Sequence, residues 1–375
     1  MVANEKFFHQ RKAAAILKHG ILSRYLRPFA MKTGSTSIGG RVVILDGYAG
    51  EGRYEDGTPG SPIHMARTAA DLAPARVVDL VLIEKNRAKH AALLRALSDE
   101  GFNLTHQPVR GGVNDHLDEV LGIAMGVPLF AFLDPYGRGL EFDDLVTKIY
   151  GRPNFQYAPA TEVLMNFSAG AVRRIGGYLR SPKSFAGKTK TLEGMDRFCG
   201  GDWWRQAYLD AGSPERATTV IATEYQSRIH RATGCGGWLI PVHNAEGLQP
   251  VYHLLYLTRH PDGIWNFGEA VSGAQEEWRR AVIQPGTLFD DDDAFRTSEQ
   301  ALEEKWVREI KRNIKALLAS RSRFIVERHY SVVFGTATGD AREKHLRRAI
   351  KELYREGSTG FNGAGRLQTA AVTRP

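Results

Sequence analysis

Residues Arg41 to Tyr54 read RVVILDGYAGEGRY, and this stretch is the main indication of the fold class. It opens with an apolar strand, Val42 to Leu45, which delivers Asp46 to the carboxyl end of that strand. The chain then turns through three glycines, Gly47, Gly50 and Gly52. Glycine accepts a positive φ angle and lets a ligand approach the backbone, and ligands of open α/β sheets lie beyond the carboxyl ends of the strands. The stretch therefore predicts a nucleotide-binding loop at the edge of such a sheet.

Strand-like and helix-like segments alternate along the chain after this loop. The predicted strands are 42–46, 79–84, 129–134 and 161–167, and the predicted helices are 61–71, 86–100, 117–125 and 142–149. Such alternation predicts a parallel sheet with right-handed crossovers and helices on both faces. The predicted fold class is a Rossmann-like, doubly wound α/β sheet. The run YHLLYLT at 252–258 is predicted as a late strand of the same sheet, and its antiparallel edge is one position for it.

Composition and periodicity divide the rest of the chain. The expected parts are an N-terminal helix and connector (1–40), the Rossmann domain (41–284) with a helical insertion (about 170–246), an acidic linker (285–297), a C-terminal helical unit (298–365) and a tail (366–375). Three helices followed by a β-like stretch make the C-terminal unit compatible with a small winged helix and equally with a plain helical cap. The last ten residues or so are expected to be disordered.

The composition restricts the class of protein. A formal net charge of +8, from 50 basic and 42 acidic side chains, suits a phosphate-bearing partner such as RNA or DNA, and also suits a basic enzyme of small metabolites. Two isolated cysteines and scattered histidines predict neither a disulfide framework nor a metal site. The N-terminus lacks a signal-peptide pattern and no stretch approaches the length of a membrane span. We expect a cytoplasmic protein without a bound metal.

The second predicted strand ends in Glu84, where a carboxylate can accept hydrogen bonds from both ribose hydroxyls of an adenosine-containing cofactor. The glycine spacing differs from GxGxxG and no GK[ST] is present, which disfavours NAD and ATP. The predicted cofactor is S-adenosylmethionine. The predicted cofactor residues are Asp46, Gly47, Gly50, Gly52, Glu84 and Asn114. The alternative for Glu84 is a surface residue that pairs with Lys85 or Arg87.

The segment LFAFLDPYG, 129–137, is apolar up to Leu133 and then breaks at Asp134 and Pro135. The predicted catalytic residues are Asp134, Pro135 and Tyr136, because Asp134 can bind an amino donor on the acceptor and Tyr136 can stack on a flat base. The alternative is a turn in which Asp134 caps the next helix. Arg173 and Arg174 are predicted to clamp phosphate, with a charged helix face as the alternative, and Tyr54 is assigned to the substrate side.

The combination of LDGYAGEGRYEDGTPGSP, LIEKN, FLDPYG, VLMNFS and YHLLYLTRHPDG resembles the three-Cys-motif partner family, TcmP, over about residues 5 to 355. The resemblance implies a class I methyltransferase that uses S-adenosylmethionine and works beside a three-Cys-motif protein in bacterial mobile or defence-like loci. Carried over to this chain, it implies that Asp46, Gly50 and Gly52 hold the cofactor. It likewise implies that Glu84 binds the ribose and that the segment Asp134 to Tyr136 receives the acceptor.

These observations predict a methyltransferase acting on an exocyclic amino group of a nucleic-acid base. The motif DPYG differs by one proline from the DPPY of adenine-methylating enzymes and is similar to the DPFG of a tRNA guanine N2-methyltransferase family, which leaves the base and the acceptor atom open. The glycine loop also resembles that of a ribosomal-RNA adenine methyltransferase. Two alternatives stand beside this hypothesis. One is a cofactor-binding regulatory or scaffolding subunit without independent turnover, and the other is methylation of a protein or a small molecule.

Overall fold

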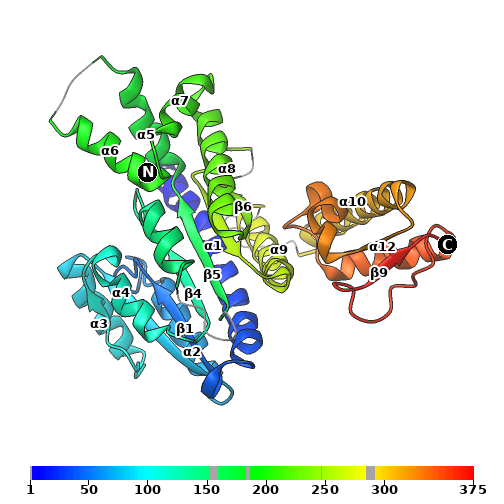
Figure 1. The fold of residues 1–375 in the computed structure, drawn as a ribbon, viewed down its shortest axis with the longest axis horizontal. Helices are drawn as coiled ribbons and strands as arrows, with labels where there is room; N and C mark the ends of the chain where they lie inside the picture. Colours follow the sequence, from blue (N-terminus) through cyan, green and yellow to red (C-terminus); the bar gives the residue numbers. More distant parts are fainter. Residues whose placement is uncertain (1, 153–158, 183–185, 246, 284–291) are drawn as a thin grey trace. The chain divides into compact units, whose positions relative to one another are not determined.

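The computed structural model describes residues 2–152, 159–182, 186–245, 247–283 and 292–375. The chain divides into two units, which Figure 1 colours along the sequence. Residues Tyr25–His260 form the sheet unit, and Met1–Arg24 together with Pro261–Pro375 form the C-terminal unit. Helix α1, Val2–Gly34, contributes residues to both. It includes Pro28 and ends at Gly34, inside the N-terminal helix and connector predicted for residues 1–40.

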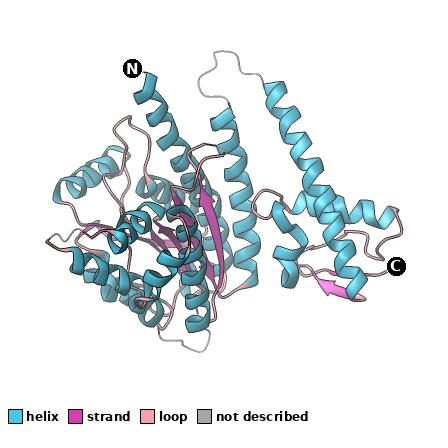
Figure 2. Ribbon diagram, turned by 90° about the horizontal axis from the view of Figure 1, so that it is seen from above, coloured by secondary structure: helices cyan, strands magenta, loops and turns pink. Residues whose placement is uncertain are grey.

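A seven-stranded sheet forms the centre of the sheet unit, and Figure 2 shows helices on both sides of it. The strands are β1 (Arg41–Asp46), β2 (Val77–Glu84), β3 (Val109–Arg110), β4 (Leu129–Leu133), β5 (Thr161–Phe167), β6 (Gly236–Val242) and β7 (Tyr252–Thr258). Their order is β3-β2-β1-β4-β5-β7-β6, in which β7 runs antiparallel to both of its neighbours. This order with a reversed β7 is the Rossmann-like, doubly wound sheet of class I methyltransferase type, so the predicted fold class is confirmed.

Helices connect the strands as the alternation predicts. They are α2 (Ser61–Leu72), α3 (Arg87–Asp99), α4 (Val113–Ile123), the π-helical turn η2 (Asp144–Ile149), α5 (Ala169–Arg180), α6 (Lys188–Cys199), α7 (Trp203–Asp210) and α8 (Pro214–Thr233), and the short η1 (Ile38–Gly40) precedes β1. The predicted helical insertion is wrong at its end, because β6 lies inside it. As a result β7 is not an edge strand, since β6 covers its outer side.

The two faces of the sheet have different covers. One face joins a core that includes Val43, Leu45 and Met165. The opposite face, which carries the alternate residues of each strand, meets α1: the ring centroids of Phe29 and Phe130 are 5.5 Å apart. The sheet is thus buried on both sides, as parallel sheets generally are.

A carboxyl group is buried between α1 and the sheet. Glu162 on β5 is 4% exposed and accepts hydrogen bonds from the Tyr25 hydroxyl at 2.6 Å and the Thr258 hydroxyl at 3.2 Å. Burial raises the pKa of Glu162 to about 7, while hydrogen bonds from Tyr25, Tyr256 and Thr258 act in the opposite direction. The folded state therefore holds the Glu162 proton more tightly than the unfolded chain does.

The titration of Glu162 is expected to make the sheet unit less stable as pH rises. The folded pKa of about 7 lies above the ordinary value of 4.5, so this contribution to the unfolding free energy falls between those two pH values and levels off above them. The total loss is about 3 kcal/mol. Urea denaturation at pH 5 to 8 should show that Glu162→Gln removes this slope and stabilises the protein at pH 8. The exposed control Glu55→Gln should keep the slope, and a parallel response of the two variants contradicts the assignment.

The C-terminal unit is mostly helical. It contains α9 (Pro261–Ile283), α10 (Asp292–Ser320), β8 (Arg323–Ile325), η3 (Glu327–His329), α11 (Tyr330–Phe334), η4 (Gly335–Ala337), α12 (Glu343–Arg355) and β9 (Ala371–Thr373). Helix α9 begins directly after β7 at Pro261, because proline fits the first position of a helix. Most of the predicted acidic linker lies outside the described residues, and its remaining part belongs to α10.

The expectation that the last residues are disordered is wrong. Strand β9 pairs with β8 in an antiparallel ladder in which Val372 lies opposite Phe324. Leu367 and Val372 are completely buried in the core of the C-terminal unit. Because the burial of these apolar side chains stabilises the ordered chain, residues 366–375 are a structural part of that unit. None of the described helices combines the length and the apolar character needed to span a membrane.

Candidate functional site

Polar side chains follow the carboxyl ends of four neighbouring strands of the sheet. They are Glu84 on β2, Asp46 on β1, Asp134 directly after β4, and Asn166 on β5. Asp46 pairs with Leu82 and with Phe132, and Phe132 pairs with Leu164. Since side chains alternate along a strand, the residues two positions further on belong to the same face as Asp46, the face that α1 covers. Strand register therefore groups these residues at one edge of the sheet.

Glu84 fastens the glycine loop to the end of β2. Its Oε2 accepts a hydrogen bond from the Gly50 amide at 2.9 Å, and its Oε1 accepts one from the Asn86 amide at 2.6 Å. The Ala49 amide also donates to the Ile83 carbonyl at 2.9 Å. Within the described part of the chain Glu84 forms no ion pair with its basic sequence neighbours, so the surface-pair alternative is not what the structure contains. The carboxylate instead lies in the loop that is predicted to bind the cofactor.

The glycines of the loop serve different purposes. Gly47 has no positive φ, and a Cβ there would lie 2.9 Å from a Leu133 methyl group, so it is needed for packing. Gly52 has φ +85° and a Cβ would lie 2.9 Å from the Cβ of Ala96. Gly50 has φ +70°, and a Cβ there would meet nothing within 4 Å. Of the three, Gly50 alone borders open space that a ligand can enter.

The Asp46 side chain is hydrogen-bonded to the backbone of the same turn. It is completely buried, and its Oδ1 accepts a hydrogen bond from the Tyr48 amide at 3.1 Å. Carboxylates that accept backbone N–H groups fix the conformation of a turn. In this structure Asp46 shapes the loop through its backbone, and the surface that a ligand can reach is formed by the residues after it.

The contrast between two glycines predicts a difference in stability. Gly52→Ala places a methyl group against Ala96 in a backbone conformation that L-residues rarely adopt, and we expect a loss of about 2–4 kcal/mol. Gly50→Ala has the same kind of backbone strain without the contact, and we expect a loss of about 1 kcal/mol. Urea denaturation of the two variants measures the difference. Equal losses would show that the packing of Gly52 on α3 is not a constraint.

Asp134 and Asn166 form a pair at the ends of β4 and β5. The Asn166 side-chain amide donates to the Asp134 carboxylate at 2.8 Å. A carboxylate only accepts hydrogen bonds, so the Asn166 NH₂ must face it. The Oδ1 of Asn166 is buried and has no hydrogen-bond partner among the described residues. The Asn166 amide therefore holds the Asp134 carboxylate in place where the two neighbouring strands end.

Asn166 was not among the predicted site residues, although the sequence holds a signal for it. Asn166 is the next-to-last residue of β5 and lies on the same face of the sheet as Asp134. Polar residues are unusual inside a strand that is buried along its whole length. The capping alternative for Asp134 fails, because the next helical residue is Phe142, well beyond the position that Asp134 could cap.

Tyr136 projects fully from the loop after β4. Its side chain is 99% exposed, and the Lys89 ammonium lies 5.3 Å from the centre of its ring. Pro135 is buried beside Gly139, so the loop that carries the ring is anchored. An exposed ring with a cation nearby can stack on a planar, electron-rich group.

The two arginines of the predicted phosphate clamp have different surroundings. Arg173 donates to the Pro250 carbonyl at 3.4 Å and is half-buried, whereas Arg174 is exposed. Arg174 is instead close to Arg138 in the loop after Tyr136. Burial lowers the pKa of the Arg138 guanidinium, and Arg197 and Arg174 lower it further through repulsion, while Glu141 opposes them. Arg138, Arg174 and Arg197 thus form a cationic group beside the acceptor loop.

Two other predicted residues lie at the rim. Asn114, at the start of α4, is exposed and donates to the Asp144 carboxylate at 3.4 Å. Tyr54 is 40% exposed in the loop between β1 and α2, where its amide donates to the Thr58 carbonyl at 2.9 Å. Their predicted roles stay predictions.

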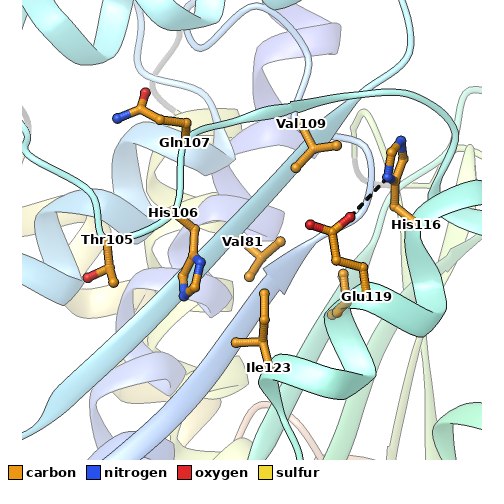
Figure 3. A pocket seen from close by; sticks show the side chains of 9 residues that line it. Val81, Thr105, His106, Gln107, Val109, His116, Glu119 and Ile123 are labelled. Atoms are coloured by element: carbon orange, nitrogen blue, oxygen red, sulfur yellow. Dashed lines mark hydrogen bonds and ion pairs between the residues drawn. The ribbon is translucent and has the colours of Figure 1, made fainter.

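Figure 3 shows a pocket of about 210 Å³ on the β3 side of the sheet. Its apolar floor includes Val81 and Ile123, and His106, His116 and Glu119 stand at its polar side. His116 Nδ1 and Glu119 Oε2 are 3.3 Å apart. None of its lining residues belongs to the predicted site. The described residues also contain no cluster of three or more His, Cys, Asp or Glu side chains suited to hold a metal ion.

Comparison with known proteins gives limited similarity. No protein-family model matches the chain, and no curated protein matches it. Among solved structures, the chain is similar to the O-methyltransferase TomG from Streptomyces achromogenes, crystallised with SAM, at 14% identity over 67% of this chain and 90% of that one, with a TM-score of 0.33. It is also similar to cofactor-bound Rv0187 from MTB, at 15% identity over 66% and 89%, with a TM-score of 0.31. The fold class therefore rests on the observed strand order and direction.

Proposed function

We propose that the chain is an S-adenosylmethionine-dependent methyltransferase that acts on an exocyclic amino group of a nucleic-acid base. The observation that carries the proposal is the Asp134 carboxylate, which the Asn166 amide holds at 2.8 Å at the strand ends next to the glycine loop. A carboxylate accepts hydrogen bonds from the N–H donors of an amino group. The fold of class I methyltransferase type supplies the context, because its ligands lie at this edge of the sheet.

The residues around the glycine loop fit the cofactor. The backbone at Gly50 borders open space, and the Glu84 carboxylate beside it can accept further hydrogen bonds from ribose hydroxyls. When bound, S-adenosylmethionine supplies an electrophilic methyl group. Glu84 would hold the ribose and Gly50 would line the approach.

The acceptor side is built to position an amine. Asp134, held by the Asn166 amide, would accept a hydrogen bond from the amino group and orient its lone pair toward the methyl group, and orientation of this kind is a large part of catalysis. Methylation leaves the nitrogen with one proton too many, and Asp134 is the base in the pair that can take it. Tyr136 would stack on the base that carries the amine.

A phosphate-bearing substrate is supported by the cations around the acceptor loop. Lys89 lies beside Tyr136, and Arg197 and Arg174 are both close enough to Arg138 to repel its guanidinium. Guanidinium groups bind phosphate oxygens through paired hydrogen bonds, and a bound phosphate would relieve that repulsion. The resemblance to TcmP adds a three-Cys-motif protein as the proposed partner.

The test combines calorimetry with methyl transfer. The purified chain, alone and with the three-Cys-motif protein, is titrated with S-adenosylmethionine and then incubated with methyl-labelled cofactor and separate RNA and DNA pools. We expect binding, and label in an N-methylated base after nuclease digestion. Binding without label under both conditions would support the regulatory alternative instead. An absence of binding would overturn the cofactor assignment, and label only in protein or small molecules would overturn the substrate class.

A further inference from the structure

The C-terminal unit has the element order of a winged helix. Helix α10 is followed by strand β8, by helices α11 and α12, and finally by β9, which returns to pair with β8. The chain after α12 returns to β9, because the Gly360 amide donates to the Thr373 carbonyl at 3.1 Å. The chain between that contact and β9, residues 361–370, is named the wing here. This element order is that of a winged helix rather than of a plain helical cap.

Helix α12 holds the position of the second helix of a helix-turn-helix. Its inner face is fully buried through Leu346, Ala349, Ile350 and Leu353 in the core that it shares with α10. Its opposite face is basic. Four cationic side chains at helical spacing are exposed there, namely Lys344, Arg348, Lys351 and Arg355. A helix with one apolar and one basic face is packed on one side and available to an anionic partner on the other.

The basic face consists of two pairs with different surroundings. Lys344 forms an ion pair with Glu303 of α10, and Arg348 forms one with Glu304 at 2.7 Å. Lys351 and Arg355 have no ion pair within the described residues. The first pair is therefore already partly neutralised, whereas the second pair supplies uncompensated charge on the C-terminal half of the helix.

The wing is fixed against the same helix. The Arg347 guanidinium donates to the Gly363 carbonyl at 2.5 Å and to the Gly365 carbonyl at 3.0 Å. Both glycines have positive φ angles, +79° and +74°. The wing tip therefore stays next to α12 and forms one continuous surface with it.

We propose that α12 and the wing form a docking surface for double-stranded DNA, with α12 in the major groove. The B-form major groove is wide enough for an α-helix, while the major groove of A-form RNA is too deep and narrow for side chains to read. Positive charge on the exposed face is complementary to the phosphates on both sides of the groove. The inference does not depend on the proposed methyl transfer, since the surface lies in a different unit from the Asp134 site.

The experiment measures binding of the full chain to a 5′-labelled DNA duplex of about 30 base pairs, long enough for a non-specific backbone contact, by fluorescence anisotropy at several salt concentrations and without methyl donor. The test variant is K351Q/R355Q. The matched control is R27Q/R95Q, which removes the same charge from exposed positions on α1 and α3. An RNA duplex of equal length is the second ligand.

We expect the wild type to bind the DNA duplex with micromolar affinity and the test variant to bind about tenfold more weakly, with a salt slope smaller by about two. The control should keep the affinity of the wild type within about twofold. Circular dichroism should show an unchanged fold for both variants, because all four positions are exposed. The proposal is overturned if the wild type does not bind the duplex, if the control weakens as much as the test variant, or if the RNA duplex binds as tightly as the DNA.

Discussion

Replacing Asp134 with alanine is expected to lower kcat/KM for methyl transfer by about 10³-fold while leaving the affinity for S-adenosylmethionine unchanged within about threefold. In the proposed reaction the substitution removes the carboxylate that would orient the amine and take its proton. It also leaves the Asn166 amide, which donates to Asp134 at 2.8 Å, without its partner. Initial rates with labelled cofactor measure the first effect and calorimetry measures the second.

A matched control separates this role from the general loss of one negative charge near the loop. Asp143, exposed in the segment that follows, can be replaced with alanine without touching the pair, and its rate should stay near that of the wild type. Asn166→Ala should give an intermediate loss, because the Asp134 carboxylate remains but loses the amide that positions it. Equal rates for Asp134→Ala and the wild type would remove Asp134 from the site. A parallel loss in cofactor affinity would show that it acts on the cofactor instead.

Replacing Glu84 with alanine is expected to raise the dissociation constant of S-adenosylmethionine by about 10²-fold. Hydrogen bonds to a charged group contribute about 1.5–3 kcal/mol each, so the loss of ribose contacts accounts for this size. The substitution also releases the Gly50 amide, which is 2.9 Å from the carboxylate, and this makes the loop less ordered before the ligand arrives. Isothermal titration calorimetry gives the value directly.

Glu51 provides the control for this prediction, because it is an exposed carboxylate in the loop that Glu84 fastens. Glu51→Ala should bind the cofactor as the wild type does. Glu84→Gln should fall between, since the amide keeps one acceptor oxygen but loses the charge. An unchanged dissociation constant in Glu84→Ala would mean that the carboxylate serves only to fasten the loop.

The sheet could be predicted because its strands carry a strong local signal. The sequence contains two uninterrupted apolar runs, Val42–Leu45 and Leu129–Leu133. Each run is followed by an aspartate and then by a glycine or a proline, and buried parallel strands have this pattern. Strand β6, Gly236–Val242, has no such pattern, because it lies at an edge, is partly exposed and contains Pro241. Its identity as a strand comes from its pairing with β7, which is a tertiary contact that periodicity cannot report.

The site could be predicted in position but not in detail. Asp46, Glu84 and Asp134 follow strands, so their common edge follows from parallel topology. The sequence does not reveal that Asp46 is completely buried, that the Glu84 carboxylate binds Gly50, or that Asn166 joins Asp134, because these depend on side-chain direction. The cationic group of Arg138, Arg174 and Arg197 comes from three separate elements and has no linear signature.

Strand β5 receives its outer neighbour late in synthesis. Val163 pairs with Leu257 of β7, and all of α5 to α8 and β6 are made between the two. Until β7 arrives, an apolar strand with unpaired backbone groups stands open, and such edges recruit other chains into aggregates. Chains that end before Tyr252 are therefore poor candidates for soluble expression, and folding in the cell will depend on protection of β5 while the ribosome completes the strand that covers it.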